Sequence, residues 1–106
     1  MYFKHTKEQE WICAGYDGAE RAVLRMSASN GRTAVVRIKA GAKGPRHLHQ
    51  AGEDVLVISG SIDLGGTVMG PGDYAWTEAG EEHALVAIED SVIYVASDKP
   101  ITLVAT

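Results

Sequence analysis

A set of three histidines and one glutamate could bind a single metal ion in this chain. The four residues are His47, His49, Glu53 and His83. Imidazole nitrogens and carboxylate oxygens bind borderline divalent metals, and neutral histidine is the commonest protein ligand for such ions. Side chains two residues apart on a strand point to the same face, so His47 and His49 can aim at one point. We therefore expect one metal centre.

The segment around these residues predicts a hairpin that brings the glutamate to the two histidines. Residues 46–49 read as the end of one strand and residues 50–52 as a short turn. Residues 53–58 follow as a second strand that is rich in branched apolar side chains, which is typical of a β-hairpin. Alternation places Glu53 and Asp54 on opposite faces, so only one of these two acids can be a ligand.

Short segments alternate with turn signals along the whole chain. Turns rich in Gly, Pro and Asn recur roughly every 8 to 12 residues, as in all-β sandwiches and barrels. His83 follows one such turn, at residues 79–82, and opens a further short strand at residues 84–88. No stretch of the sequence has the apolar periodicity expected of a helix. We predict an all-β jelly roll, a double-stranded β-helix of antiparallel strands, with the metal inside the barrel near one mouth.

Residues 41–60 carry a family motif. They read glycine, five residues, His47-x-His49, three residues, Glu53, six residues and glycine. This pattern matches the first motif of the cupin superfamily at every position, so the chain resembles a cupin over this stretch.

Residues 72–87 resemble the second cupin motif in part. They carry its first glycine, Gly80 and His83 at the usual spacing, but Glu78 stands where proline is usual and Ala87 where asparagine is usual. In cupins, the two histidines and the glutamate of the first motif and the histidine of the second bind the metal. The resemblance therefore implies a complete ligand set: His47, His49, Glu53 and His83.

Within the superfamily, residues 33–41, 45–49 and 52–60 are similar to small cupins related to the sensory domain of ChrR-type anti-sigma factors. That group includes metal-dependent dioxygenases of small organic compounds as well as domains with no known catalysis. Three histidines and one glutamate would complete a tetrahedral zinc site, or leave two positions open on a six-coordinate Fe(II), Mn(II), Ni(II) or Cu(II) ion. We expect a divalent metal, with Fe(II) favoured.

Three functions follow as expectations. The first, which makes the protein an enzyme, is a small metal-dependent dioxygenase that acts on an oxygenated small organic molecule. The alternatives are a non-catalytic sensory cupin that binds a metal or small ligand, and a metal-dependent isomerase or lyase. The isomerase or lyase would need an additional base in the barrel, and Tyr74 is the nearest candidate.

Several residues could line a substrate pocket. Tyr74 and Trp76 share one strand face and could form the cavity wall, although aromatic residues in strands are more often core. Arg37 and Arg25 could anchor an anionic or carbonyl-bearing substrate, and a surface position is their plainer interpretation. Cys13 lies in an apolar strand, and we expect it to be a buried residue that fills space in the core.

Composition narrows the class of protein. With 106 residues and 45% apolar residues, the sequence predicts a single cupin domain over residues 1–106. The formal charge is −4 without a Lys/Arg run, so we expect neither nucleic acid nor membrane as a partner. The first ten residues lack the apolar segment of a signal peptide and the chain has one cysteine, which favours a cytoplasmic location.

Outward-facing apolar residues suggest a homodimer. Leu48, Leu56 and Ile58 alternate against the ligand-bearing face, which would leave them pointing out of the smaller sheet. Closed two-fold dimers are the commonest oligomers, so a dimer that buries these residues is one expectation. The other is that the strand at residues 11–13 covers them within one chain.

Overall fold

Short strands make up most of residues 1–103, the part of the chain that the computed structural model describes. The elements are the 3-10 turn η1 (Thr6–Glu8) and the strands β1 (Ile12–Cys13), β2 (Ala19–Met26), β3 (Arg32–Ile38), β4 (Lys43–His49), β5 (Glu53–Ser59), β6 (Ile62–Leu64), β7 (Thr67–Met69), β8 (Tyr74–Thr77), β9 (Glu82–Ala87), β10 (Ser91–Ser97) and β11 (Ile101–Leu103). Within these residues, no helical segment has the length and apolar character that a membrane-spanning helix requires.

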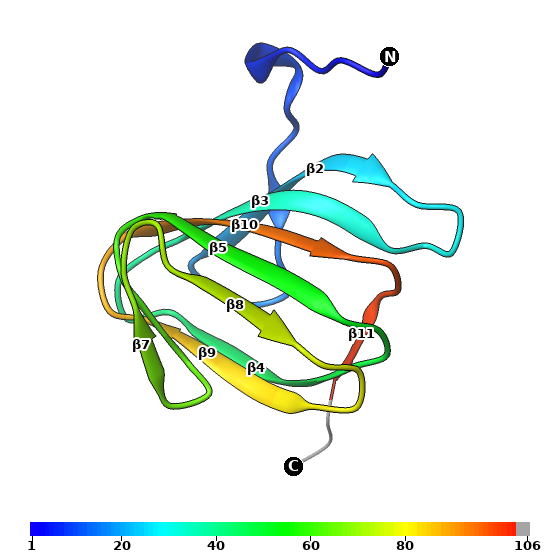
Figure 1. Ribbon diagram of the computed structural model, residues 1–106. Coiled ribbons are helices and arrows are strands. Elements are labelled where there is room, and N and C mark those ends of the chain that lie inside the picture. Colours follow the sequence, from blue (N-terminus) through cyan, green and yellow to red (C-terminus); the bar gives the residue numbers. More distant parts are fainter. Residues whose placement is uncertain (104–106) are drawn as a thin grey trace.

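The strands form two antiparallel sheets that face each other (Figure 1). The six-stranded sheet has the order β1-β2-β3-β10-β5-β8, and the five-stranded sheet has the order β11-β4-β9-β6-β7. Consecutive strands β4 and β5 lie in different sheets, so the hairpin predicted at residues 50–52 is instead a connection between the sheets. The predicted all-β jelly roll is confirmed.

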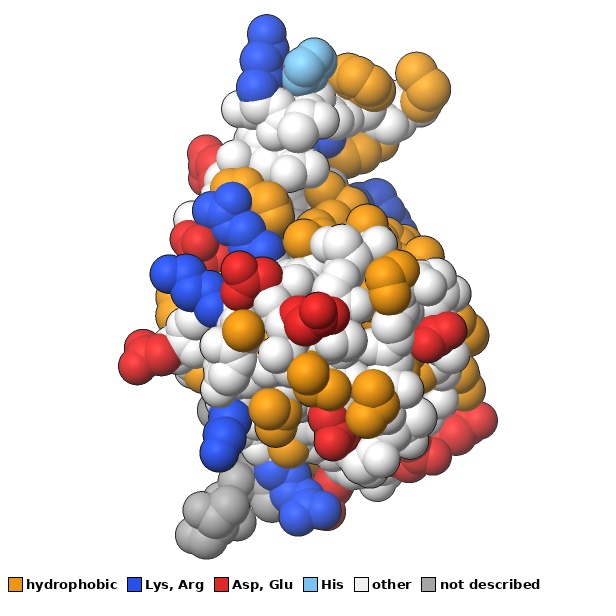
Figure 2. Space-filling model, turned by 90° about the vertical axis from the view of Figure 1, so that its left-hand side faces the viewer, with side chains coloured by type: hydrophobic (Ala, Val, Ile, Leu, Met, Phe, Trp, Pro, Cys, Tyr) orange, Lys and Arg blue, Asp and Glu red, His pale blue; other side chains and the backbone are white. Residues whose placement is uncertain are grey.

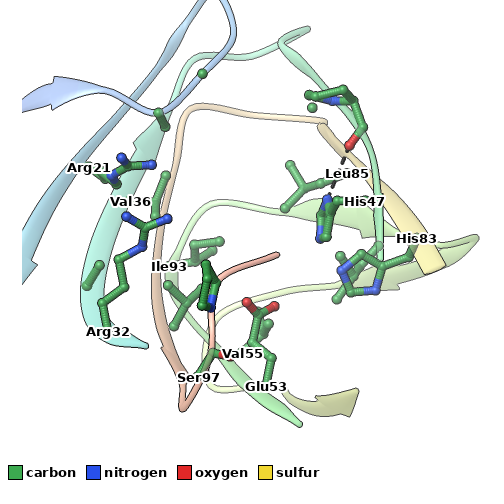
Figure 3. A pocket seen from close by; sticks show the side chains of 18 of the residues that line it. Arg21, Arg32, Val36, His47, Glu53, Val55, His83, Leu85, Ile93 and Ser97 are labelled. Carbon is green, nitrogen blue, oxygen red and sulfur yellow. Dashed lines mark hydrogen bonds between the residues drawn. The ribbon is translucent and has the colours of Figure 1, made fainter. Parts of the chain in front are cut away.

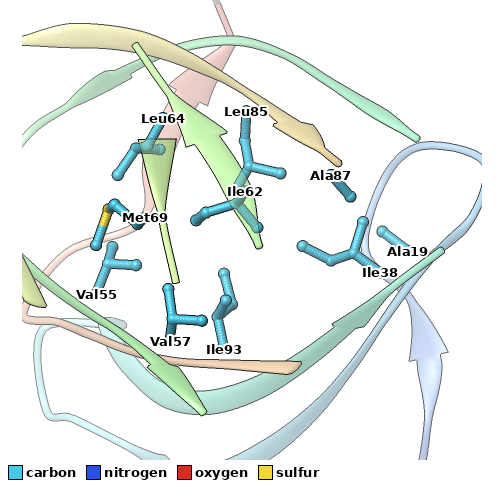
Figure 4. Packing of buried hydrophobic residues seen from close by; sticks show 10 residues of the cluster. All are labelled: Ala19, Ile38, Val55, Val57, Ile62, Leu64, Met69, Leu85, Ala87 and Ile93. Atoms are coloured by element: carbon cyan, nitrogen blue, oxygen red, sulfur yellow. The ribbon is translucent and has the colours of Figure 1, made fainter. Parts of the chain in front are cut away.

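Alternate side chains of both sheets fill the interior with apolar groups. Val55 and Val57 of β5 and Ile93 of β10 face Ile62 and Leu85 of the opposite sheet, as Figure 4 shows. Each is buried, and burying a side chain of this size contributes about 1.5–3 kcal/mol relative to its exposure. This cluster also contains Ala19, Ile38, Leu64, Met69 and Ala87.

Two of the three apolar residues predicted to point out of the smaller sheet lie on the larger one. Leu56 and Ile58 are exposed, as expected, but β5 belongs to the six-stranded sheet. Leu48 of β4 does lie on the five-stranded sheet, where it is half-buried. Strand β1 is at the far edge of the six-stranded sheet, separated from β5 by three strands, so it does not cover Leu56 and Ile58. The two-fold dimer therefore stays a prediction.

The N-terminal segment projects from the two sheets, and charged side chains of both signs are spread among apolar ones on the face shown in Figure 2. Cys13 is exposed, so the expectation of a buried filler was wrong. The reason is its place on β1, a two-residue edge strand that pairs only with β2.

Candidate metal centre

Both sheets supply side chains to one polar cluster inside the barrel. His47 of β4 and His83 of β9 are direct cross-strand partners in the five-stranded sheet, and His49 lies two residues further along β4 on the same face. Glu53 is the first residue of β5 and reaches the cluster from the facing sheet. The short connection between β4 and β5 therefore carries the chain from one wall of the site to the other.

The turn before His83 is tied directly to His49. The backbone N–H of Gly80 donates to the carbonyl of His49 at 2.8 Å, and the N–H of His49 donates to the carbonyl of Glu81 at 3.0 Å. Gly80 has a φ of 91°, a left-handed conformation that glycine adopts without a steric penalty. These two bonds fix the start of β9 against the end of β4, which holds the His49 and His83 rings together.

The ligand atoms of the four residues converge. One nitrogen or oxygen atom from each of His47, His49, Glu53 and His83 lies within 4.8 Å of the others. The Nε2 atoms of His49 and His83 are 3.0 Å apart, and His49 Nε2 is 3.7 Å from Glu53 Oε1. Ligands bound to one ion at about 2.1 Å lie at most about 4.2 Å apart, so shifts of well under 1 Å complete a site. The donor set and its spacing fit a divalent metal.

Burial keeps the three imidazoles in the form that binds metal. It lowers the pKa of His49 and of His83 to about 4, with neighbouring histidines adding to the effect. Burial also lowers the pKa of His47, although the bond to Pro45 opposes it. His47 Nδ1 lies 3.2 Å from the Pro45 carbonyl, and donation there leaves Nε2 with a free lone pair (Figure 3). At neutral pH the cluster therefore offers neutral imidazoles.

Glu53 has the opposite shift. Burial raises the pKa of its carboxyl group to about 7, nearby Asp54 adds to the rise, and Arg32 opposes it. Because His49 is neutral, its contact with Glu53 is not an ion pair at neutral pH. A cation that enters the site must displace the proton of Glu53 but none from the histidines.

This difference predicts how metal affinity depends on pH. As the pH falls below about 7, Glu53 takes up a proton, and the affinity for Zn(II) is expected to fall by up to about tenfold per pH unit. The histidines do not compete until the pH approaches 4. Competition with a chromophoric chelator between about pH 8 and pH 5.5 measures the slope. Glu53→Gln should bind more weakly with a flat profile. Asp54→Asn should keep the wild-type slope, with its onset at lower pH because Asp54 no longer raises the pKa of Glu53. A wild-type slope in Glu53→Gln would contradict the assignment.

A cavity of about 300 Å³ adjoins the cluster and is largely apolar in its lining. His47, Glu53 and His83 face into it in Figure 3. This is the small end of the range for sites that hold organic ligands. Its other walls include Tyr16, Arg21, Arg32, Val36, Val55, Leu85, Ile93, Val95, Ser97 and Lys99. The sequence pattern did not indicate that Arg21, Arg32 and Tyr16 would line a cavity.

The predicted anchor Arg37 does not line this cavity. Its side chain pairs with Glu20 at 3.0 Å and lies over the ring of Trp11, 4.0 Å from the ring centre. Alternation along β3 explains the correction, because the neighbouring Ile38 is buried and Arg37 must then point outward. Arg25 is also exposed.

The predicted wall residues Tyr74 and Trp76 are likewise outside the cavity next to the cluster. They are 57% and 51% exposed. On β8 they pair with Leu56 and Asp54, which point outward, and the Tyr74 hydroxyl donates to the Asp54 carboxylate. The inward partner of Glu53 on this strand is Thr77, which is buried.

A jelly roll in which three histidines and a glutamate meet inside the barrel, beside an apolar cavity, defines a cupin with a candidate metal site. The chain belongs to the family of ChrR cupin-like domains, whose sequence profile matches residues 1–102. The family predicted from the two motifs is thereby confirmed.

Known proteins show the same fold. The chain resembles an acetylacetone dioxygenase from Acinetobacter johnsonii with a TM-score of 0.87 and 18% identity, over 99% of this chain and 78% of that one. It resembles a chain in the complex of Rhodobacter sphaeroides SigE with the anti-sigma ChrR with a TM-score of 0.76 and 25% identity, over 89% and 51% of the two chains. The identity to the dioxygenase is low enough that this likeness shows the fold alone.

A relative from Arabidopsis thaliana shares sequence as well. The DNA damage-repair/toleration protein DRT102 is 33% identical over 72 residues, which cover 62% of this chain and 23% of that protein. The chain thus spans about a quarter of the length of the curated relative that it matches.

Proposed function

We propose that this cupin binds one divalent metal ion, Fe(II) in the working protein, and is a small dioxygenase of an oxygenated organic molecule. The observation that carries the proposal is the convergence of three imidazoles and one carboxyl group at the wall of a small apolar cavity. The fold shared with an acetylacetone dioxygenase supports it.

The residues of the chain have separate roles in this proposal. His47, His49 and His83 hold the metal with neutral nitrogens, and Glu53 gives up its proton as the metal binds. When bound, Fe(II) supplies Lewis acidity and one-electron redox chemistry. Apolar wall residues of the cavity keep bulk water from the organic ligand; they include Val55, Leu85 and Ile93.

Oxygen consumption tests the proposal. Protein loaded anaerobically with Fe(II) is mixed with air-saturated buffer and a panel of β-diketones, catechols, hydroxyketones and oxo acids, and dissolved oxygen is followed with an electrode. We expect at least one compound to be consumed with dioxygen in equimolar amounts, and a chelator to stop the reaction. Loaded protein that consumes no oxygen with any member of the panel would contradict catalysis.

The family match favours a second candidate, a non-catalytic metal-binding sensor. The supporting observation is the similarity to a chain of the SigE complex with ChrR. If this candidate is correct, the protein binds metal but consumes no oxygen in the assay. Removal of the metal should then change the amount of a partner protein that the chain captures.

The isomerase or lyase alternative loses its candidate base. Tyr74 is exposed on the outer face, and Tyr16 is the tyrosine that lines the cavity among the described residues. Burial raises the pKa of Tyr16 above its ordinary value of 10. A phenol that holds its proton this firmly is not a base at neutral pH, so the structure offers this alternative no additional support.

A further inference from the structure

Two arginines face the interior beside the candidate metal site. Arg21 lies on β2, opposite Val36 of β3, and Arg32 starts β3 two residues before the buried Ala34. Both line the cavity of about 300 Å³. In Figure 3 their guanidinium groups lie next to each other on one side of this cavity, with His47 and His83 across from them.

This arginine pair lacks matching negative charge. Among the described residues that line the cavity, Glu53 is the only carboxyl group, against Arg21, Arg32 and Lys99. Arg21 Nε is buried and has no hydrogen-bond partner within the described part of the chain. A buried donor without a partner destabilises the fold, and more so when the group is charged. The cavity therefore favours an anionic ligand.

Metal binding would deepen the imbalance. Glu53 is the nearby acid that offsets the charge of Arg32, and burial and the proximity of Arg21 both lower the pKa of Arg32. A divalent cation adds more positive charge to the cavity than the single carboxyl group of Glu53 can compensate. Arg37, by contrast, has its own partner in Glu20 on the outer face.

The space between the two ends of the cavity is apolar. Val36, Val55, Ile93 and Val95 line it, and they offer no hydrogen bond from their side chains. A ligand that fills the cavity would then have an anionic end at the arginines, an apolar body, and an end near the imidazoles. The volume limits it to a small molecule.

We propose that Arg21 and Arg32 form a carboxylate-binding subsite, and that the substrate is a small organic acid with its oxygenated end toward the candidate metal site. The planar guanidinium forks match a carboxylate with paired hydrogen bonds. The substrate role rests on the proposed dioxygenase function, whereas the carboxylate subsite does not.

Calorimetric titration with named probes tests the subsite. The probes are benzoate and 4-oxopentanoate, their uncharged amides, and inorganic phosphate, each titrated into protein as purified and after metal removal. We expect at least one carboxylate to bind, and its amide to bind at least tenfold more weakly. Arg21→Met and Arg32→Met should each weaken carboxylate binding at least tenfold. Arg25 is an exposed arginine of β2, the strand that carries Arg21, and Arg25→Met should leave carboxylate binding unchanged.

The outcomes separate the subsite from the catalytic proposal. Carboxylate binding to metal-free protein that is lost in both cavity variants supports the subsite even if no oxygen is consumed. The subsite is overturned if no carboxylate binds, if each amide binds as well as its acid, or if phosphate alone binds. It is also overturned if both variants keep wild-type affinity. The contrast between acid and amide on wild-type protein decides the question even where a variant fails to fold.

Discussion

His49→Ala is expected to remove tight metal binding, with the dissociation constant for Zn(II) or Fe(II) rising at least about 100-fold. His49 is 1% exposed, and its Nε2 atom lies 3.0 Å from that of His83. Loss of groups that only support a ligand already costs about 10–100-fold in metal affinity, so loss of a ligand costs at least as much. Equilibrium dialysis followed by elemental analysis measures the change.

His5→Ala is the matched control for this experiment. His5 is an exposed histidine in the projecting N-terminal segment, where its side chain accepts a hydrogen bond from the Lys7 N–H. Its replacement should leave one metal ion per chain. If His49→Ala also retained one ion per chain at wild-type affinity, the candidate metal centre would be wrong.

Metal binding is expected to stabilise the folded chain strongly. A ligand at 1,000 times its dissociation constant adds about 4 kcal/mol to the free energy of unfolding when it binds only the folded state. For a domain of this size, each kcal/mol raises the melting temperature by roughly 4–8 °C. We therefore expect saturation with Zn(II) to raise Tm by about 10 °C or more, even if the unfolded chain binds some metal.

Thermal melts with and without a chelator measure this effect. His49→Ala should show a much smaller rise, because its folded state no longer offers the complete site and its weaker affinity leaves less binding energy to stabilise the fold. A wild-type Tm that does not change with metal would show that the four residues bind no ion. An equal rise in His49→Ala would place the ion elsewhere.

The candidate metal ligands could be predicted from the sequence because most of them lie close together along the chain. His47 and His49 are two residues apart on β4, so strand alternation alone puts them on one face. The same rule separates Glu53 from Asp54, and the structure has Glu53 inside and Asp54 paired with Tyr74 outside. Motif spacing added His83, whose position opposite His47 depends on strand pairing.

The arginine pair could not be predicted because the inward face of its strands is not readable from the sequence. Residues 34–36 of β3 are apolar in succession, so either face can be the buried one. On β2 a register shift between Val23 and Arg25 breaks the alternation. Simple alternation would place Arg21 and Arg25 on the same face of β2. In the structure, Arg21 lines the cavity and Arg25 is exposed.

The misplaced aromatic residues have a similar cause. Which strand pairs with β5, and in which register, decides whether Tyr74 and Trp76 face the cavity. In the structure Glu53 pairs with Thr77, so both side chains point inward. The neighbouring Trp76 therefore points outward. Neither the pairing nor the register is encoded in the spacing of the aromatic residues.

X-ray absorption spectroscopy of the metal-loaded protein tests the central claim most directly. His47, His49, His83 and Glu53 are the proposed ligands. At one equivalent of metal, we predict the scattering of three imidazoles together with oxygen ligands in the first shell, and fewer imidazoles in His49→Ala. A first shell with one imidazole or none, or an identical spectrum in His49→Ala, would contradict this prediction.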